Sequence, residues 1–220
     1  MRLERTLLTV VGLPVAVALA GALGAATGSL DPMAGFGLWT FGLLVAGLSG
    51  LAGGLLLRLK GGSWRPVLLG GVALVLLFAP ALPGMGKPPI NDITTDVVDP
   101  PRLDDAKAPG GIGLDMDYDP AFAAVTKESY PDLAAVPFVG KTDVGLDRAA
   151  SCLEKDGGRG LFRGPSSVQA TYQSRVFRFR DDAVIRLEDG RFDLRSRSRD
   201  GKGDLGVNAA RIQRLATCLR

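Results

Sequence analysis

Three long apolar stretches near the amino end constrain this chain more than any other feature of its sequence. They cover residues 7–26, 36–57 and 66–82, and none contains Asp, Glu, Lys or Arg. The first two reach the roughly 20 residues that a helix needs to cross a bilayer, and the third is near the lower limit. We therefore predict a transmembrane region over residues 1–83, and we expect the lipid bilayer to be its first partner.

The distribution of charge places a boundary near residue 90. Residues 1–90 hold only two acidic residues, Glu4 and Asp31, whereas residues 91–220 hold 21 acidic and 20 basic residues. The small net charge of +3 comes from the membrane part, so it gives no argument for nucleic-acid binding. The first apolar stretch has a signal peptide as its alternative, but its uninterrupted length favours a retained helix.

The basic residues also predict an orientation. Arg2 and Arg5 precede the first stretch, and Arg58, Lys60 and Arg65 flank the second connection, while residues 27–35 contain no basic residue. The positive-inside rule then places the amino end in the cytoplasm. Three crossings leave the carboxyl-terminal part in the periplasm or lumen, held by an inner membrane of cytoplasmic or photosynthetic type.

Small residues recur every four positions in the first two stretches, and such rows let helices approach closely in lipid. Two interpretations stay open: the first two helices simply pack on each other, or a row is left for a partner subunit. The absence of charge within the stretches argues against a transporter. The residues of the two rows are Gly12, Ala16, Ala20 and Gly24, and Gly42, Ala46, Gly50 and Gly54.

Residues 84–120 form a tether rich in Pro and Gly, in which 90–98 alternates as a strand does. The spacing of Asp115, Asp117 and Asp119 matches the first ligand positions of an EF-hand calcium loop. Pro120 and Thr126 stand where the loop needs Gly and Glu, so we expect a solvated acidic loop and no metal. A water-soluble domain then follows over residues 121–220.

The soluble domain begins with a predicted helix at 142–156 and a strand at 166–172, which 175–180 continues by alternation. The chain has no histidine, which removes the commonest general base and metal ligand. Cys152 and Cys218 lie beside the apolar stripes of the first and last predicted helices. They form either a disulfide or two separate buried thiols.

The strongest local signal is a hairpin whose two-residue turn is Asp189 and Gly190. This turn fixes the register, so one face becomes the core and the other carries charge. The core face ends in Ser196 and Ser198. The cross-strand partners on the charged face are Glu188 with Arg191, Arg186 with Asp193, and Asp182 with Arg197.

Four arginines remain without an oppositely charged cross-strand partner: Arg178, Arg180, Arg195 and Arg199. Either acidic residues nearby neutralise them, or they bind an anion such as phosphate or a lipid headgroup, or an acidic partner. After the hairpin, Leu205, Asn208, Ile212, Leu215 and Leu219 predict one buried stripe of a last helix. A buried amide must be hydrogen-bonded, so we expect Asn208 to bind Ser196, Ser198 or a backbone group.

Four segments resemble domain of unknown function family 1499: TDVVDPPR at 95–102, YPDLAAV at 130–136, FRFRDDAVIRL at 177–187 and RSRSRDGKGDLGVNAARI at 195–212. The resemblance covers about residues 90–219 and implies a soluble domain on the far side of a membrane, but no reaction. We call the matching polar positions the signature residues. They are Asp181, Asp182, Arg195, Ser196, Arg197, Ser198, Arg199, Asp204 and Asn208.

Together these patterns predict an α+β domain, an antiparallel sheet with two helices on one face, after three transmembrane helices. We expect a non-catalytic accessory or assembly subunit of a larger photosynthetic or respiratory type of membrane complex, without cofactor. One alternative is a binding module for an anionic ligand at the arginine-rich sheet edge. Another is a hydrolase that uses Asp181 or Asp182, or a serine with a lysine.

Overall fold

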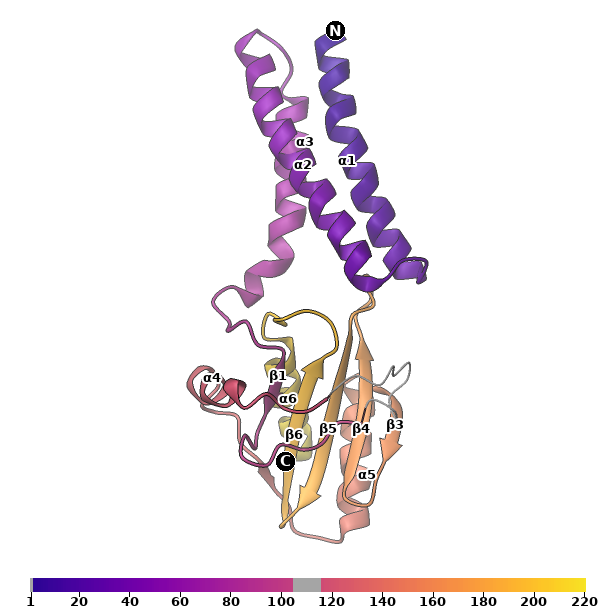
Figure 1. Ribbon diagram of the computed structural model, residues 1–220, viewed down its shortest axis with the longest axis vertical. Helices are drawn as coiled ribbons and strands as arrows, with labels where there is room; N and C mark the ends of the chain where they lie inside the picture. The colour runs from indigo at the N-terminus through magenta and orange to yellow at the C-terminus, as the bar shows by residue number, and fades with distance from the viewer. Residues whose placement is uncertain (1, 105–115) are drawn as a thin grey trace. The chain divides into compact units, whose positions relative to one another are not determined.

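The computed structural model describes residues 2–104 and 116–220, and Asp115 of the acidic loop lies outside them. Met1–Met85 and Ser174–Arg178 form one compact unit, and Gly86–Gln173 and Phe179–Arg220 form a second. The first unit contains three helices long and apolar enough to cross a membrane, as predicted. They are α1 (Arg2–Thr27), α2 (Pro32–Leu59) and α3 (Arg65–Phe78), which continues as the 3₁₀ helix η1 (Ala79–Gly84) (Figure 1).

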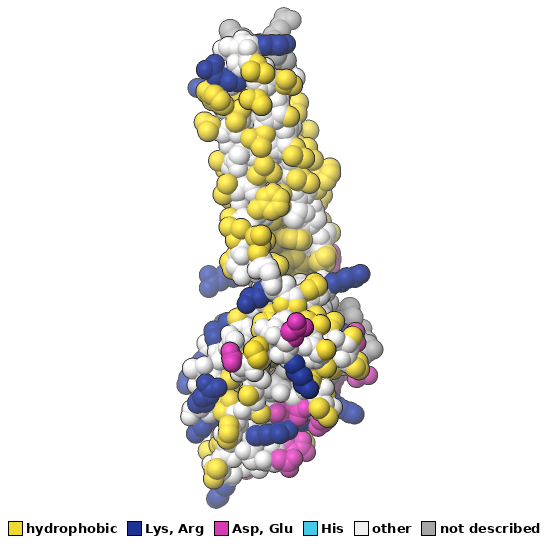
Figure 2. All heavy atoms as spheres, turned by 90° about the vertical axis from the view of Figure 1, so that its left-hand side faces the viewer, with side chains coloured by type: hydrophobic (Ala, Val, Ile, Leu, Met, Phe, Trp, Pro, Cys, Tyr) yellow, Lys and Arg dark blue, Asp and Glu magenta, His cyan; other side chains and the backbone are white. Residues whose placement is uncertain are grey.

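The helix ends follow from local chemistry. The carboxylate of Asp31 accepts hydrogen bonds from the backbone N–H groups of Met33 and Ala34, at 2.9 and 3.2 Å, so α2 begins four residues before the apolar stretch. Pro80 and Pro83 cannot donate backbone hydrogen bonds, and the third helix tightens into η1 where they occur. The surface of the helices is hydrophobic along their length, with basic side chains gathered at one end (Figure 2).

The small residues of α2 are buried between two neighbours. A Cβ on Gly42 would stand 2.4 Å from the carbonyl oxygen of Pro14 in α1, and one on Gly50 would stand 2.7 Å from Gly70 in α3. Residues four apart advance 40° beyond a full turn, so the row winds from α1 to α3. The row Gly42, Ala46, Gly50 and Gly54 is thus used entirely within the chain.

The row of α1 behaves differently. Gly12, Ala16 and Ala20 are exposed, and Gly24, half-buried, faces Leu30 of the connection between α1 and α2. The buried face of α1 is instead Val11, Ala18, Gly21 and Ala25. The interpretation in which the first two helices pack on each other is therefore confirmed, although α1 packs on α2 through the side opposite its own row.

The second unit is built on an antiparallel sheet in the order β1-β6-β5-β4-β3, with β2 also paired to β6. The strands are β1 (Asp92–Thr94), β2 (Val136–Pro137), β3 (Arg159–Arg163), β4 (Ser167–Gln173), β5 (Arg180–Glu188) and β6 (Arg191–Ser198). The helices of this unit are α4 (Ala121–Ser129), α5 (Thr142–Lys155) and α6 (Val207–Leu219). The predicted hairpin register is confirmed at every pair, from Glu188 with Arg191 to Asp182 with Arg197.

Helices α5 and α6 cover one face of the sheet (Figure 1). Their apolar stripes pack on the inward side chains of the hairpin, among which Ile185, Phe192 and Leu194 are fully buried. The two predicted helices on one face are therefore confirmed. On the other face, Leu103 and Met116 pack on Val184, so the segments on either side of residues 105–115 cover it.

Two local predictions are corrected, and two short elements lie outside the predictions. Residues 175–177 form a turn and no strand, because the N–H of Arg178 bonds back to the carbonyl of Ser174 at 3.1 Å. Leu205 is 54% exposed and has a φ of 55°, since it belongs to the turn before α6 and not to its buried stripe. The short helix α4 and strand β3 carry no strong pattern in the sequence and were not predicted.

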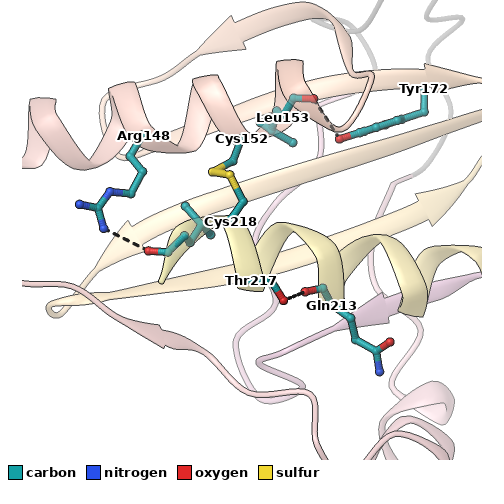
Figure 3. Close-up of a disulfide and its surroundings, with 8 residues drawn as sticks. Arg148, Cys152, Leu153, Tyr172, Gln213, Thr217 and Cys218 are labelled. Carbon is teal, nitrogen blue, oxygen red and sulfur yellow. Dashed lines mark hydrogen bonds between the residues drawn. A yellow bond between two sulfur atoms is a disulfide. The ribbon is translucent and has the colours of Figure 1, made fainter.

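A disulfide joins Cys152 of α5 to Cys218 of α6, so of the two alternatives for these cysteines the structure contains the covalent one (Figure 3). Arg148 of α5 donates to the carbonyl oxygen of Leu219 at 3.1 Å beside it. The hydroxyl of Tyr172 in β4 donates to the carbonyl oxygen of Leu153 at 3.4 Å. The two helices are thereby tied to each other and to the sheet.

Candidate functional site

The charged face of the sheet is where the sequence places most candidate residues, and its centre is the pair Asp92 and Arg195. The guanidinium donates from Nε and Nη2 to the two carboxylate oxygens at 2.9 and 2.7 Å, and both side chains are 2% exposed. Two backbone carbonyls, of Pro101 and Met116, accept the remaining bonds at 3.1 and 2.7 Å. Burial raises the pKa of Asp92, while Arg195 opposes this shift by its hydrogen bonds and charge.

Asp182 and Arg199 form a second buried pair. Nε and Nη2 of Arg199 donate to the carboxylate at 2.6 and 2.8 Å, and the hydroxyl of Thr171 donates to it at 2.6 Å. Arg197 faces Asp182 in the register, but its guanidinium donates to the carbonyl oxygen of Asp117 at 3.0 Å. The predicted ion pair of Asp182 with Arg197 is therefore wrong, since the diagonal neighbour Arg199 takes its place.

A third cluster surrounds Asp193. Its carboxylate lies 3.4 Å from Arg186, as predicted, and 3.1 Å from Arg191. The tether adds two carboxylates, Asp99 at 2.7 Å from Arg186 and Asp96 at 2.9 Å from Arg191. Glu188 pairs with Arg186 at 3.4 Å and not with Arg191, its neighbour in the register.

The pKa of Asp96 is set by opposing effects. Burial would raise it, but hydrogen bonds from the backbone N–H groups of Asp99 and Val98, and then the charges of Arg191 and Arg186, lower it below its usual value. The tether therefore contributes an ionised carboxylate that neutralises the end of the hairpin.

A fourth network lies on the helix-covered face, around Arg211 of α6. Its guanidinium donates to Asp181 at 2.7 Å, to Ser196 at 2.8 Å and to the amide oxygen of Asn208 at 2.6 Å, and it stacks 4.2 Å from the ring centre of Tyr172. Since Arg211 brings its charge into the core, these contacts offset much of the cost of its burial.

Asn208 makes the hydrogen bonds expected of a buried amide. Its oxygen accepts from the hydroxyl of Ser196 at 2.7 Å, and its nitrogen donates to Ser198 and to the carbonyl of Asn91. Asp204 accepts from the N–H groups of Gly206 and Asn208 at 2.8 and 2.7 Å, and so holds the turn that starts α6. These signature residues form a hydrogen-bonded anchor between β6 and α6.

Of the four arginines proposed to bind an anion, two are engaged in buried ion pairs and a third begins a central strand. Arg195 and Arg199 are buried in the pairs described above. Arg180 begins β5, where its carbonyl accepts from the N–H of Arg199 at 2.8 Å and its N–H donates to Asp200 at 3.4 Å. Arg178 belongs to the first unit. Anion binding at a shared sheet edge therefore stays a prediction, to which these positions lend no support.

The carboxylates proposed for a hydrolase are also engaged, Asp181 with Arg211 and Asp182 with Arg199. A cavity of about 210 Å³ lies elsewhere, beside Leu133, Gln213 and Thr217 and flanked by Asp132 and Arg220. Within residues 2–104 and 116–220, no group of three His, Cys, Asp or Glu side chains is arranged to hold a metal ion.

Sequence reasoning missed Asp92, Asp96 and Asp99 as partners of the hairpin arginines. The available signal was complementary charge. The tether is rich in aspartate, and the hairpin about 90 residues later has surplus arginines. The carbonyl groups of Pro101 and Met116 gave no signal, because every residue has one.

The family described as "Protein of unknown function (DUF1499)" matches residues 92–219, which is more than half of the chain. The chain belongs to the DUF1499 family. The DUF1499 match begins at Asp92, the partner of Arg195, and therefore includes the tether that covers the charged face. Comparison with curated proteins and with solved structures found no match.

Proposed function

We propose that this chain is a non-catalytic accessory subunit of a larger membrane complex, with its DUF1499 domain on the extracytoplasmic side. One observation carries the proposal: the signature side chains form their ion pairs and hydrogen bonds with other groups of the same domain. Asp181, Asp182, Arg195 and Arg199 each form a buried or half-buried ion pair. Such networks fix the position of the tether and of α6, and they make the domain rigid, as a structural subunit requires.

The exposed row of α1 supports a partner within the membrane. Gly12, Ala16 and Ala20 lie on the side opposite the face that packs on α2, and a Cβ on Gly12 would meet no atom within 4 Å. A second helix could approach closely there, since helices in lipid associate through small residues. The disulfide supports the extracytoplasmic side, because disulfides persist in oxidising compartments.

The proposal is tested by purifying the tagged full-length chain from its native membrane in mild detergent. We expect it to migrate on a native gel with other subunits in fixed stoichiometry. Ala16→Leu combined with Ala20→Leu fills the row and should release the chain from that complex. Val72→Leu, on the exposed face of α3, is the matched control and should change nothing. A wild-type chain that purifies alone as a monomer overturns the proposal.

A further inference from the structure

The segment Ser174–Arg178 is distant in sequence from the helices, yet it forms one compact unit with them. It is a tight turn, closed by the hydrogen bond from the N–H of Arg178 to the carbonyl of Ser174 at 3.1 Å. Arg178 has a φ of 58°, a conformation that a non-glycine residue adopts at a cost. The turn is thus held in a defined shape within the first unit.

Two side chains, Phe177 and Arg178, contact the helices from this turn. The ring of Phe177 meets those of Phe36 and Trp39 in α2 edge to face, with ring centres 5.2 and 5.4 Å apart. The guanidinium of Arg178 lies over Gly28, where an added Cβ would meet its Nη1 at 2.9 Å. Since α1 ends at Thr27 with no basic residue in its last turn, Arg178 supplies the positive charge that a helix carboxyl end favours.

These contacts fix the depth of the turn in a bilayer. The α1–α2 connection lies at a membrane surface, because both helices end there. Phe36 and Trp39 follow Pro32 by four and seven residues, or about 6 and 10 Å along the axis. The polar layer of each leaflet is about 5–8 Å thick. Phe177 therefore lies near the boundary between headgroups and hydrocarbon, where aromatic rings are enriched.

The charges beside this boundary are positive. Arg175 is exposed, and within the described part of the chain no carboxylate lies in ion-pair distance of Arg175 or Arg178. The one acidic residue of the α1–α2 connection, Asp31, accepts hydrogen bonds at the start of α2. Val176 is 49% exposed and adds an apolar contact.

We propose that the turn Ser174–Arg178 binds the headgroup of an anionic phospholipid at this membrane surface. Arg175 and Arg178 donate to the lipid phosphate, for which guanidinium has the matching geometry. Phe177 and Val176 lie against the top of the acyl chains. This lipid site goes beyond the subunit role and needs no partner protein. It also separates Arg178 from Arg195 and Arg199, which are buried in ion pairs of the sheet.

Trp39 provides the test because it contacts Phe177. The full-length Trp64→Phe chain is reconstituted in nanodiscs that contain either acyl-brominated phosphatidylglycerol or acyl-brominated phosphatidylcholine as a minor component. Bromine quenches tryptophan fluorescence at short range, so the ratio of the two quenching curves reports lipid preference beside Trp39. We expect phosphatidylglycerol to be preferred, and Arg175→Gln and Arg178→Gln each to lower the preference about fivefold.

The controls keep this experiment decisive. Arg178→Lys keeps the charge and should retain most of the preference, whereas Arg159→Gln removes an exposed arginine of β3 and should change nothing. Equal quenching by the two lipids overturns the proposal, as does a preference that survives the combined Arg175→Gln and Arg178→Gln changes. If millimolar inorganic phosphate abolishes the preference, the ligand is a soluble anion and the lipid assignment is wrong.

Discussion

The two faces of the DUF1499 sheet are covered in different ways, although they arise from the same alternating strands. One face is mainly apolar, with one buried polar network around Arg211, and is covered by α5 and α6, which a disulfide joins. The other is charged and is covered by the chain on either side of residues 105–115, through ion pairs and backbone carbonyls. An outward charged face is therefore not the same as a solvent-facing one, because a tether with complementary charge can bury it.

The largest effect on stability is expected from removing the disulfide that joins the two helices of the helix-covered face. Replacing Cys152 and Cys218 by Ser opens a loop with a sequence separation of 66. The loss of unfolding free energy should be about 4 kcal/mol by the chain-entropy relation. Denaturant unfolding of the full-length chain in detergent, with and without reductant, measures it. If reductant leaves the wild type as stable as before, the disulfide does not hold this face together.

A somewhat smaller effect is expected on the charged face. Arg195→Met leaves the carboxyl of Asp92 buried without its ion partner, which should cost about 3 kcal/mol. The cost stays near the lower end of the usual range because Asp92 can take up a proton. The same denaturant measurement checks this value.

The matched control is the double variant Asp92→Asn with Arg195→Met, which removes the buried charge altogether. It should recover part of the lost stability. A double variant less stable than Arg195→Met would show that other groups satisfy the charge of Asp92, and that the charged face does not depend on this ion pair.

The smallest effect is a pH dependence of stability that comes from Asp96 on the charged face. The folded-state pKa of Asp96 lies below its unfolded value of 3.8, so its contribution is complete above that value and is lost as the pH falls through the folded pKa. Asp96→Asn should therefore flatten the decline in stability between about pH 5 and about pH 2. Thermal unfolding across this range is the measurement, with Asp132→Asn, an exposed aspartate, as control. Equal slopes in both variants would assign acid sensitivity to other carboxylates.

The sequence by itself determined the elements whose causes are local. Three uncharged apolar stretches gave the three membrane-length helices, and the two-residue turn at Asp189 and Gly190 gave the register of the hairpin. Asn208 could be recognised as a buried, hydrogen-bonded amide because it interrupts an apolar stripe. Each of these conclusions needs only periodicity, turn chemistry and the cost of an unpaired polar group.

The tertiary structure alone decided which groups meet across long separations. Asp92 lies 103 residues before Arg195, and no local rule selects it over the other aspartates of the tether. The side of α1 that packs on α2 was likewise open, since two sides of that helix carry small residues. Residues 175–180 alternate as a strand does, and only the backbone hydrogen bond of the turn and its contacts with Phe36, Trp39 and Gly28 show otherwise. Ion pairs and helix contacts depend on position in space, which the fold fixes only once the whole chain has packed.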